Sequence, residues 1–479
     1  MKKVIQFIFM GFAILLAVMI FRTLTFKSKQ VEVANVAIPA LPKQSLEHFQ
    51  AAISYKTISF NYETKPDSAQ FTGFRHFLEK TYPLVHQNLK RELVNNYSML
   101  FEWKGKNAAL KPVILMAHQD VVPIEVASKH LWKVDPFAGI VKDDFIWGRG
   151  TVDDKINLIS IMEGAEKLLA SGFQPERSIY FVFGHDEELS GQKGAIPIAK
   201  MLADRGVKAE FVLDEGGMVT TTKVPNITKP AAMIATAEKG YMSIELSTQM
   251  EGGHSSSPAK ETAIDLISRA INKLRENQPK ARITSVMSDF FDYLGPEMPF
   301  LQKMIMANQW ITKPILMGIY EKNPQSAAMM RTTTVPTILT AGIKDNVIPM
   351  IATATVNFRI LQGEDSKTVL AHVTKVIDDE RVKVKVVGHI TEPSKITSVD
   401  SEGFKIVSKA AKQHFDGAIA APFLLIGATD SRYFTKVSEN IIKFSPMIDP
   451  IGFHTINERV SLDSYKRSLA FFEDLMKGF

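Results

Sequence analysis

The stretch SIYFVFGHDEELSG, residues 178–191, joins a short apolar run to three consecutive acids. A continuous apolar run of this length is typical of a strand that is covered on both faces of its sheet. Asp186, Glu187 and Glu188 follow directly, and adjacent carboxylates repel one another unless solvent or a cation neutralises them. The stretch therefore predicts a buried sheet with a charged site at the end of one strand.

Two further runs have the same form, namely KPVILMAHQD (111–120) and AEFVLDEGG (209–217). Residues 154–172 and 193–206 have helical apolar spacing and each ends at a glycine. Strands that alternate with helices indicate an α/β fold with a mostly parallel central sheet flanked by helices. We assign residues 45–237 and 392–479 to this domain.

Residues 238–391 have a different pattern. The segments YMSIELS (241–247), TATVNFRI (353–360) and RVKVKVV (381–387) alternate apolar with polar residues, as strands with one solvated face do. This pattern predicts a smaller α+β domain inserted into the first. Within it, residues 298–330 are rich in Met and aromatics; we expect helices packed on the inserted domain, and the alternative is an apolar wall for an acyl chain or a bilayer surface.

The amino-terminal segment is the most apolar part of the chain. Residues 4–21 are 18 apolar or small residues interrupted only by Gln6, which is just long enough to span a bilayer as a helix. No small-x-small cleavage site follows closely, so we favour an uncleaved membrane anchor over a signal peptide for residues 1–30. We expect the globular part outside the cytoplasm, or secreted if the segment is cleaved.

Net charge argues against a nucleic-acid partner. The chain has a formal charge of +6, but five basic residues and no acid lie in residues 1–31, so the remainder carries 52 basic and 51 acidic residues. A basic footprint for nucleic acid is therefore absent.

Polar residues follow each strand and precede the first helix. They are His118 and Asp120, Asp153 and Asp154, Glu187 and Glu188, and Asp214 and Glu215. Ligands of α/β sheets bind where parallel strands end, so these groups are expected to meet. A divalent cation would make their crowding tolerable, and with 0 Cys in the chain its ligands must be His and carboxylates.

Six motifs resemble one known family, the M20 zinc peptidases, and their order is the same. They are MAHQDVVP (116–123), WKVDPFAGIVKDDFIWGRGTVDDK (132–155), GHDEELSGQKGA (184–195), VLDEGG (212–217), EGGHSSSP (251–258) and GFHTINERV (452–460). The branch it resembles most contains the Gly-X carboxypeptidase and the N-fatty-acyl-amino-acid synthase/hydrolase. The resemblance implies two zinc ions per site, and an inserted domain that serves as a lid or forms a homodimer.

The resemblance also implies a role for each matching residue. His118 and Asp214 would bind one metal, Glu188 and His454 the other, and Asp153 would bridge them, with a cis peptide to Asp154. Asp120 would orient His118, and Glu187 would be the general base.

In the inserted domain, His254 matches the histidine that stabilises the oxyanion, sometimes from a partner subunit. Asn346 and Arg359 match lid residues near the substrate's terminal carboxylate. Arg432, in the first domain, is a second candidate for binding that anion, because Arg forms bidentate pairs with carboxylates.

These expectations define a membrane-anchored zinc hydrolase of carboxypeptidase type. It would cleave the amide bond of N-acyl amino acids or dipeptides that have a free carboxylate, and its substrate would be a small amide or short peptide. The alternatives are a dipeptidase or aminoacylase for short polar substrates, and a catalytically silent binding module tethered to the membrane. A silent binder has no need of Glu187.

Overall fold

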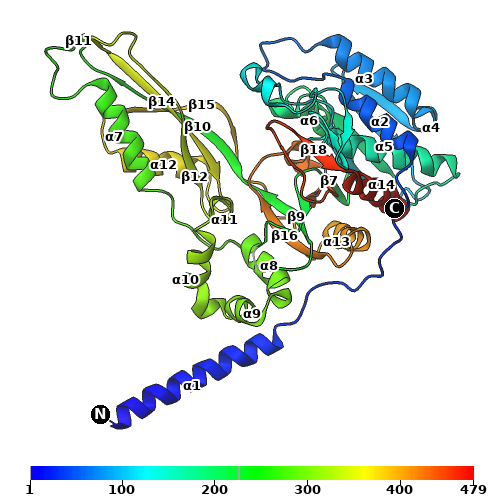
Figure 1. Ribbon diagram of the computed structural model, residues 1–479, viewed down its shortest axis with the longest axis horizontal. Helices are drawn as coiled ribbons and strands as arrows, with labels where there is room; N and C mark the ends of the chain where they lie inside the picture. Colours follow the sequence, from blue (N-terminus) through cyan, green and yellow to red (C-terminus); the bar gives the residue numbers. More distant parts are fainter. Residues whose placement is uncertain (1, 225–226) are drawn as a thin grey trace.

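The computed structural model describes residues 2–224 and 227–479, and its largest element is a nine-stranded sheet (Figure 1). Eight strands follow one another in space as β1 (Lys90–Val94), β2 (Ser98–Trp103), β6 (Ile179–Gly184), β3 (Val113–His118), β7 (Phe211–Asp214), β17 (Ile441–Lys443), β9 (Ala231–Glu238) and β16 (Ile419–Leu425). The ninth, β8 (Met218–Thr220), pairs with β9. The three strands predicted from apolar runs are central in this sheet.

The sheet is mixed, whereas the sequence predicted a mostly parallel one. Strands β6, β3, β7 and β17 are parallel to one another, as expected, but β1, β2 and β9 introduce antiparallel pairs. The reason at one edge is local, because Asn95 and Asn96 adopt positive φ and join β1 to β2 in a hairpin. A hairpin reverses the chain, so no crossover helix is present there.

Both faces of the parallel strands are covered by helices. One face packs on α2 (Lys43–Ser54), α3 (Ser68–Thr81), α4 (Pro83–Asn88), α5 (Lys155–Ala170), α13 (Glu402–His414) and α14 (Leu462–Lys477). The other packs on α6 (Ala195–Asp204) and the 3-10 segment η4 (Asp430–Lys436). In β3, Leu115 faces the first core, while Ile114 and Met116 face the second. The apolar runs are continuous because these strands are buried on both faces of the sheet, as predicted.

A second sheet lies inside the predicted insert. Its four antiparallel strands are ordered β12 (Thr333–Ala341), β14 (Ile351–Ile360), β10 (Gly240–Gln249) and β15 (Lys383–Thr391). Helices α7 (Ala263–Glu276) and α12 (Ser366–Ile377) pack on one face and form a separate core, to which β10 contributes Met242, Ile244 and Leu246. Alternate residues of β10 are less buried, which explains the alternating pattern in the sequence.

Two of the connections between the sheets lie next to each other. The chain leaves β9 at Glu238, enters β10 at Gly240, and returns after β15 through Ser394. Ser394 N–H donates to Glu238 O (3.0 Å), and Glu238 N–H donates to Ser394 Oγ (2.8 Å). The two connections are therefore bonded to one another where they pass between the sheets.

The Met-rich region forms helices α8 (Ser285–Leu294), α9 (Phe300–Ala307), α10 (Gln309–Tyr320) and α11 (Pro324–Ala328). The sequence predicts helices packed on the inserted domain; in the structure Phe291 and Leu294 of α8 share a core with Ile419 and Leu424 of β16 in the large sheet. The apolar face of α8 thus covers the edge of the large sheet. This arrangement places α9 and α10 between the two sheets and the amino-terminal helix (Figure 1).

Helix α1 (Lys2–Thr25) projects from the body of the molecule (Figure 1). Within the described residues it is the one helix long and apolar enough to cross a membrane, a property that a signal anchor and a signal sequence share. Its carboxyl end contacts the helices just described, because Asn308 Nδ2 donates to Met19 O (3.1 Å) and Arg22 Nε donates to Ala307 O (3.4 Å).

The remaining short elements are the 3-10 segments η1 (Val126–Leu131), η2 (Glu187–Leu189) and η3 (Gly295–Glu297), the pair β11 (Gly253–His254) and β13 (Val347–Ile348), and the small sheet of β4 (Ile140–Lys142), β5 (Phe145–Trp147) and β18 (Arg459–Ser461). In the small sheet β5 pairs with β18, which holds the loop that precedes Asp153 close to the loop that carries His454.

Candidate metal centre and active site

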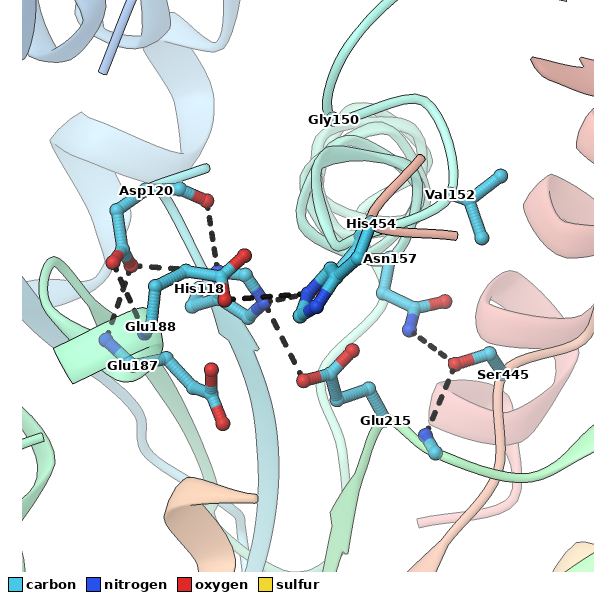
Figure 2. A network of polar contacts seen from close by, with 12 residues as sticks. His118, Asp120, Gly150, Val152, Asn157, Glu187, Glu188, Glu215, Ser445 and His454 are labelled. Atoms are coloured by element: carbon cyan, nitrogen blue, oxygen red, sulfur yellow. Dashed lines mark hydrogen bonds and ion pairs between the residues drawn. The ribbon is translucent and has the colours of Figure 1, made fainter. Parts of the chain in front are cut away.

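The polar groups predicted at the strand ends meet at one edge of the large sheet (Figure 2). His118 is the last residue of β3, Glu187 begins η2 shortly after β6, and Asp214 ends β7. These three strands are parallel, so their carboxyl ends lie at the same edge. Asp153 and Asp154 join the group because they immediately precede α5.

His118 is at the centre of the group and is buried. Its Nδ1 donates to Asp120 O (2.9 Å), so Nε2 is left facing Asp153 Oδ1 (2.8 Å) and Glu215 Oε1 (3.4 Å). Ligand atoms of His118, Asp153 and Glu188 all lie within 4.8 Å of one another, and so do those of His118, Asp154 and Glu215. Two groups of potential ligands therefore share one imidazole.

Asp153 lies between two histidines. Its Oδ1 faces His118, and its Oδ2 is 2.7 Å from His454 Nε2, which is also 3.3 Å from Glu188 Oε2. Burial would raise the pKa of Asp153, but hydrogen bonds from His118 and His454 hold it well below its usual range. The two oxygens of Asp153 therefore face different histidines. The peptide between Asp153 and Asp154 is cis, which confirms the expectation from the resemblance.

The other carboxylates are crowded and poorly compensated by protein groups. Burial, followed by the charge of Glu215, raises the pKa of Asp154 well above its usual value. Burial and the charge of Asp153 raise the pKa of Glu215 to about 8 and that of Glu188 to about 6. Both oxygens of Asp154 and Oε1 of Glu188 are buried and lack a hydrogen-bond partner among the described residues. A cation fits this donor set, because it supplies the missing partners and favours the ionised carboxylates.

Glu215 lies where the sequence reasoning predicted Asp214. We predicted Asp214 as the ligand beside His118, and the structure brings Glu215 there, while Asp214 Oδ2 accepts a hydrogen bond from Ser431 N–H (2.8 Å). Neighbouring side chains at the end of a strand point to opposite sides, so one of the two faces His118. The sequence LDEGG shows the pair of acids, but it does not show which of the two side chains points toward His118.

Asp120 connects the imidazole to the Glu187–Glu188 turn. Its Oδ1 accepts from Glu187 N–H and its Oδ2 from Glu188 N–H, both at 3.2 Å, and Oδ1 lies 3.4 Å from His118 Nδ1. The turn therefore directs the two acidic side chains to different places. Glu188 points to His454, and Glu187 lines the adjacent cavity, where burial raises its pKa well above its usual value.

A cavity of about 1090 Å³ extends from these acids to the Met-rich helices. Arg359 and Arg432 line it, as does His389, which stacks on Tyr241 at 4.8 Å. The guanidinium of Arg359 lies over the same Tyr241 ring at 4.9 Å. His389 and Tyr241 were not among the predicted site residues, because no local motif marks residues that only the pairing of β10 with β15 brings together.

The two arginines have different surroundings. Arg432 forms an ion pair with buried Glu238 (2.6 Å), which also pairs with Lys443 (2.8 Å). Arg359 is held by the aromatic face of Tyr241, and burial lowers its pKa. Arg359 is therefore the better placed of the two to receive an anionic group in the cavity.

His254 and Asn346 are not brought to this site within one chain. Both lie at the pairing of β11 with β13, where Ser255 N–H donates to Asn346 O (3.1 Å). His254 is exposed, and its Nδ1 is 2.8 Å from Ser256 Oγ. Figure 1 shows β11 at the end of the four-stranded sheet far from the large sheet. The predicted role of His254 would require a partner subunit.

Comparison with known proteins agrees with this geometry. Residues 114–478 match the model of peptidase family M20/M25/M40. The chain is 38% identical to the probable carboxypeptidase S-like 2 of Dictyostelium discoideum, over 97% of this chain and 92% of that protein. It is 37% identical to an N-fatty-acyl-amino acid synthase/hydrolase of Xenopus tropicalis, over 98% of this chain and 93% of that protein.

Among solved structures, an M20 family metallo-carboxypeptidase from Sulfolobus solfataricus matches with a TM-score of 0.69 at 18% identity, over 91% of this chain and 99% of that one. At this identity the match shows the fold, while the sequence relatives and the family model show the descent. The chain therefore belongs to peptidase family M20/M25/M40.

Proposed function

We propose that this protein hydrolyses the amide bond of N-acyl amino acids that have a free carboxylate, using two zinc ions. The observation that carries the proposal is the convergence of two histidines and four carboxylates, Asp153 among them, beside a large cavity. His118, Asp153, Glu188 and His454 would hold the metals, with Glu215 or Asp214 completing the set. Zinc supplies Lewis acidity, which makes a carbonyl carbon more electrophilic and water more acidic.

Glu187 is the general base of the proposed reaction. It takes a proton from the attacking water and later gives it to the leaving amine, so its own protonation state is restored in each cycle. Its position supports this role, because it lines the cavity beside the metal ligands while Asp120 holds its backbone. A raised pKa suits a group that must accept and release a proton near neutral pH.

Arg359 binds the substrate's free carboxylate in this proposal. Its guanidinium faces the cavity, and cation–π contact with Tyr241 fixes its plane without neutralising its charge. Arg432 contributes less to binding of the carboxylate, because its charge is already neutralised by the ion pair with Glu238.

The cavity supports an apolar acyl group. Its far part is lined by side chains of α8, α9 and α10, including Phe290, Ile305, Met306 and Leu316, and by Met298, which precedes α9. Flexible methionines among these side chains accommodate apolar ligands of varied shape. This lining favours N-fatty-acyl amino acids over the second candidate substrates, which are dipeptides and short polar N-acyl amino acids.

The test is hydrolysis by the purified full chain in detergent, with a long-chain N-acyl amino acid, an N-acetyl amino acid and a dipeptide as substrates. We expect activity that chelation abolishes and zinc restores, with kcat/KM highest for the long-chain substrate. Equal kcat/KM for all three would contradict the acyl preference. No zinc-dependent turnover of any of them would favour a silent binding module instead.

We further propose that α1 anchors the protein with its globular part outside the cytoplasm, and that the four-stranded sheet forms a homodimer. The length of α1 supports the first proposal, and the exposed His254 supports the second, because its catalytic role needs a partner. Protease accessibility in intact cells tests the first. Complementation between a His254→Ala chain and a Glu187→Gln chain tests the second, since mixed dimers would regain activity.

A further inference from the structure

The helices that line the far part of the cavity also carry exposed apolar side chains. On α9 and α10 these are Phe300, Leu301, Trp310, Ile311, Ile315 and Ile319, and we call them the α9–α10 face. Trp310 is 56% exposed and Leu301 is 59% exposed. Exposed apolar side chains that gather on two packed helices indicate an interaction surface, unlike single scattered ones.

The same two helices are apolar on their inner side as well. Met306 and Leu316 are buried in the core that α8 shares with β16. A helix with apolar side chains on both its inner and its outer side normally has an apolar neighbour on each of them. Because the inner side of each helix already packs on the protein, the α9–α10 face requires a second apolar environment.

The segment that contains α9 and α10 is basic, which favours an anionic partner for the α9–α10 face. Between Glu297 and Glu321 the sequence contains no acid and two basic residues, Lys303 and Lys313. Arg22, Lys27 and Lys29 follow the apolar segment of α1. Basic residues beside exposed aromatic and aliphatic side chains are typical of helices that lie on an anionic lipid surface.

Helix α1 shows where a membrane would lie. Asn308, between α9 and α10, donates to Met19 O (3.1 Å) and to Thr23 Oγ1 (3.4 Å), and Thr23 is buried. Arg22 contacts Ala307 O at the end of α9. The carboxyl end of the one candidate spanning helix among the described residues is therefore fixed to the junction of α9 and α10 (Figure 1).

We propose that the α9–α10 face is a membrane-docking surface, and that its occupant is the headgroup and upper acyl region of a phospholipid bilayer. Its position beside α1, its exposed apolar side chains and its lack of acids all agree with this one occupant. A second copy of the chain would explain the apolar side chains, but not the position at the end of α1.

The docking surface meets the cavity. Leu301 and Ile319 belong to the α9–α10 face and also line the cavity, so they form part of its rim. A bilayer against this face would let an acyl chain pass from the lipid phase to the metal centre without crossing water. This consequence rests on the proposed acyl substrate, whereas the docking itself does not.

Tryptophan fluorescence tests the docking directly. Of the four tryptophans, all of which the structure describes, Trp103, Trp132 and Trp147 are buried and Trp310 is exposed. The full chain is reconstituted in vesicles of phosphatidylcholine and phosphatidylglycerol, with or without bromine on the upper acyl carbons. The difference in emission between wild type and Trp310→Phe isolates Trp310.

We expect brominated lipid to remove at least half of this Trp310 emission and aqueous acrylamide to quench it little. Acrylamide quenching with no effect of bromine would show that Trp310 is in water and would overturn the proposal. Protection from both quenchers would also overturn it, in favour of a second copy of the chain.

Activity provides a separate measurement. Ile311 and Ile315 are exposed and do not line the cavity, so Ile311→Ser with Ile315→Ser alters the face alone. We expect this variant to lose at least 5-fold in kcat/KM for a vesicle-dissolved N-acyl amino acid and to keep its activity on a soluble N-acetyl amino acid. Equal losses on both substrates would contradict docking. If wild type hydrolyses neither substrate, the proposed function fails, and fluorescence still decides the docking.

Discussion

Replacing Glu215 by Gln tests which of the two acids in the LDEGG motif, Asp214 or Glu215, binds the metal. Glu215 Oε1 lies 3.4 Å from His118 Nε2, and the side chain is buried beside Asp153 and Asp154. Loss of a second-sphere group near a metal costs about 10- to 100-fold in affinity, and loss of a ligand is expected to cost at least the upper value. A 100-fold change corresponds to about 2.7 kcal/mol of binding free energy.

The change has opposite effects on the two forms of the protein. Without metal, Glu215→Gln removes a carboxylate from a crowded site, so the melting temperature should rise. With zinc at about 1,000 times the wild-type dissociation constant, binding stabilises wild type by about 4.1 kcal/mol. The same concentration is about 10 times the variant's dissociation constant and gives about 1.4 kcal/mol. The zinc-induced stabilisation should therefore fall by roughly two thirds.

Asp214→Asn is the matched control, because Asp214 is the neighbouring acid and accepts a hydrogen bond from Ser431. Melting curves in chelator and in a zinc titration give the stabilisation, and competition with a chromophoric chelator gives the dissociation constants. A contrary result would be that Asp214→Asn weakens zinc binding about 100-fold while Glu215→Gln changes it less than about 3-fold. Asp214 would then be the zinc ligand, although Glu215 lies beside His118.

Three further predictions follow from other contacts. Glu187→Gln should keep zinc content and lower kcat by about 10²- to 10⁴-fold, measured by metal analysis and steady-state kinetics; retained turnover would remove it from the base role. Asp120→Asn should weaken zinc binding about 10- to 100-fold, because Asp120 holds both His118 and the backbone of Glu187 and Glu188; unchanged affinity would limit it to a packing role. Glu238→Gln should destabilise the fold by about 3–5 kcal/mol near neutral pH, since it leaves Arg432 and Lys443 buried without a counter-charge. Although burial opposes the shift, Lys443 and Arg432 lower the pKa of Glu238 from 4.5 to about 2, so its ionised form stabilises the fold above pH 4.5 and this contribution is lost as the pH falls toward 2. The difference in unfolding free energy between wild type and Glu238→Gln, from urea denaturation, should shrink over that range, and a constant difference would contradict the assignment.

The strand-end residues could be predicted because the pattern is local. His118 and Glu187 follow apolar runs whose two-sided burial is visible in the sequence, and parallel pairing then brings the ends together. The choice between Asp214 and Glu215 depended on side-chain direction at one strand end, which no periodicity fixes in a four-residue strand.

Other features depended on long-range packing. Tyr241 and His389 meet through strand pairing across most of the inserted segment, where β10 and β15 have an irregular register. The packing of α8 on β16 joins residues more than a hundred positions apart, and an apolar helix face does not specify which of two sheets it covers.

The paired connections at Glu238 and Ser394 have a mechanical consequence. Because these two crossings lie side by side, and Lys239 Nζ also donates to Ala328 O and Arg331 O of a third crossing, a rotation there would move the four-stranded sheet as one unit. Arg359, Tyr241 and His389 travel with that sheet, while His118 and Asp153 stay with the other. A substrate whose carboxylate is bound by Arg359 and whose carbonyl is bound at the metal centre would contact both sheets. Its binding would therefore favour a closed arrangement in which the two sheets approach each other around the cavity.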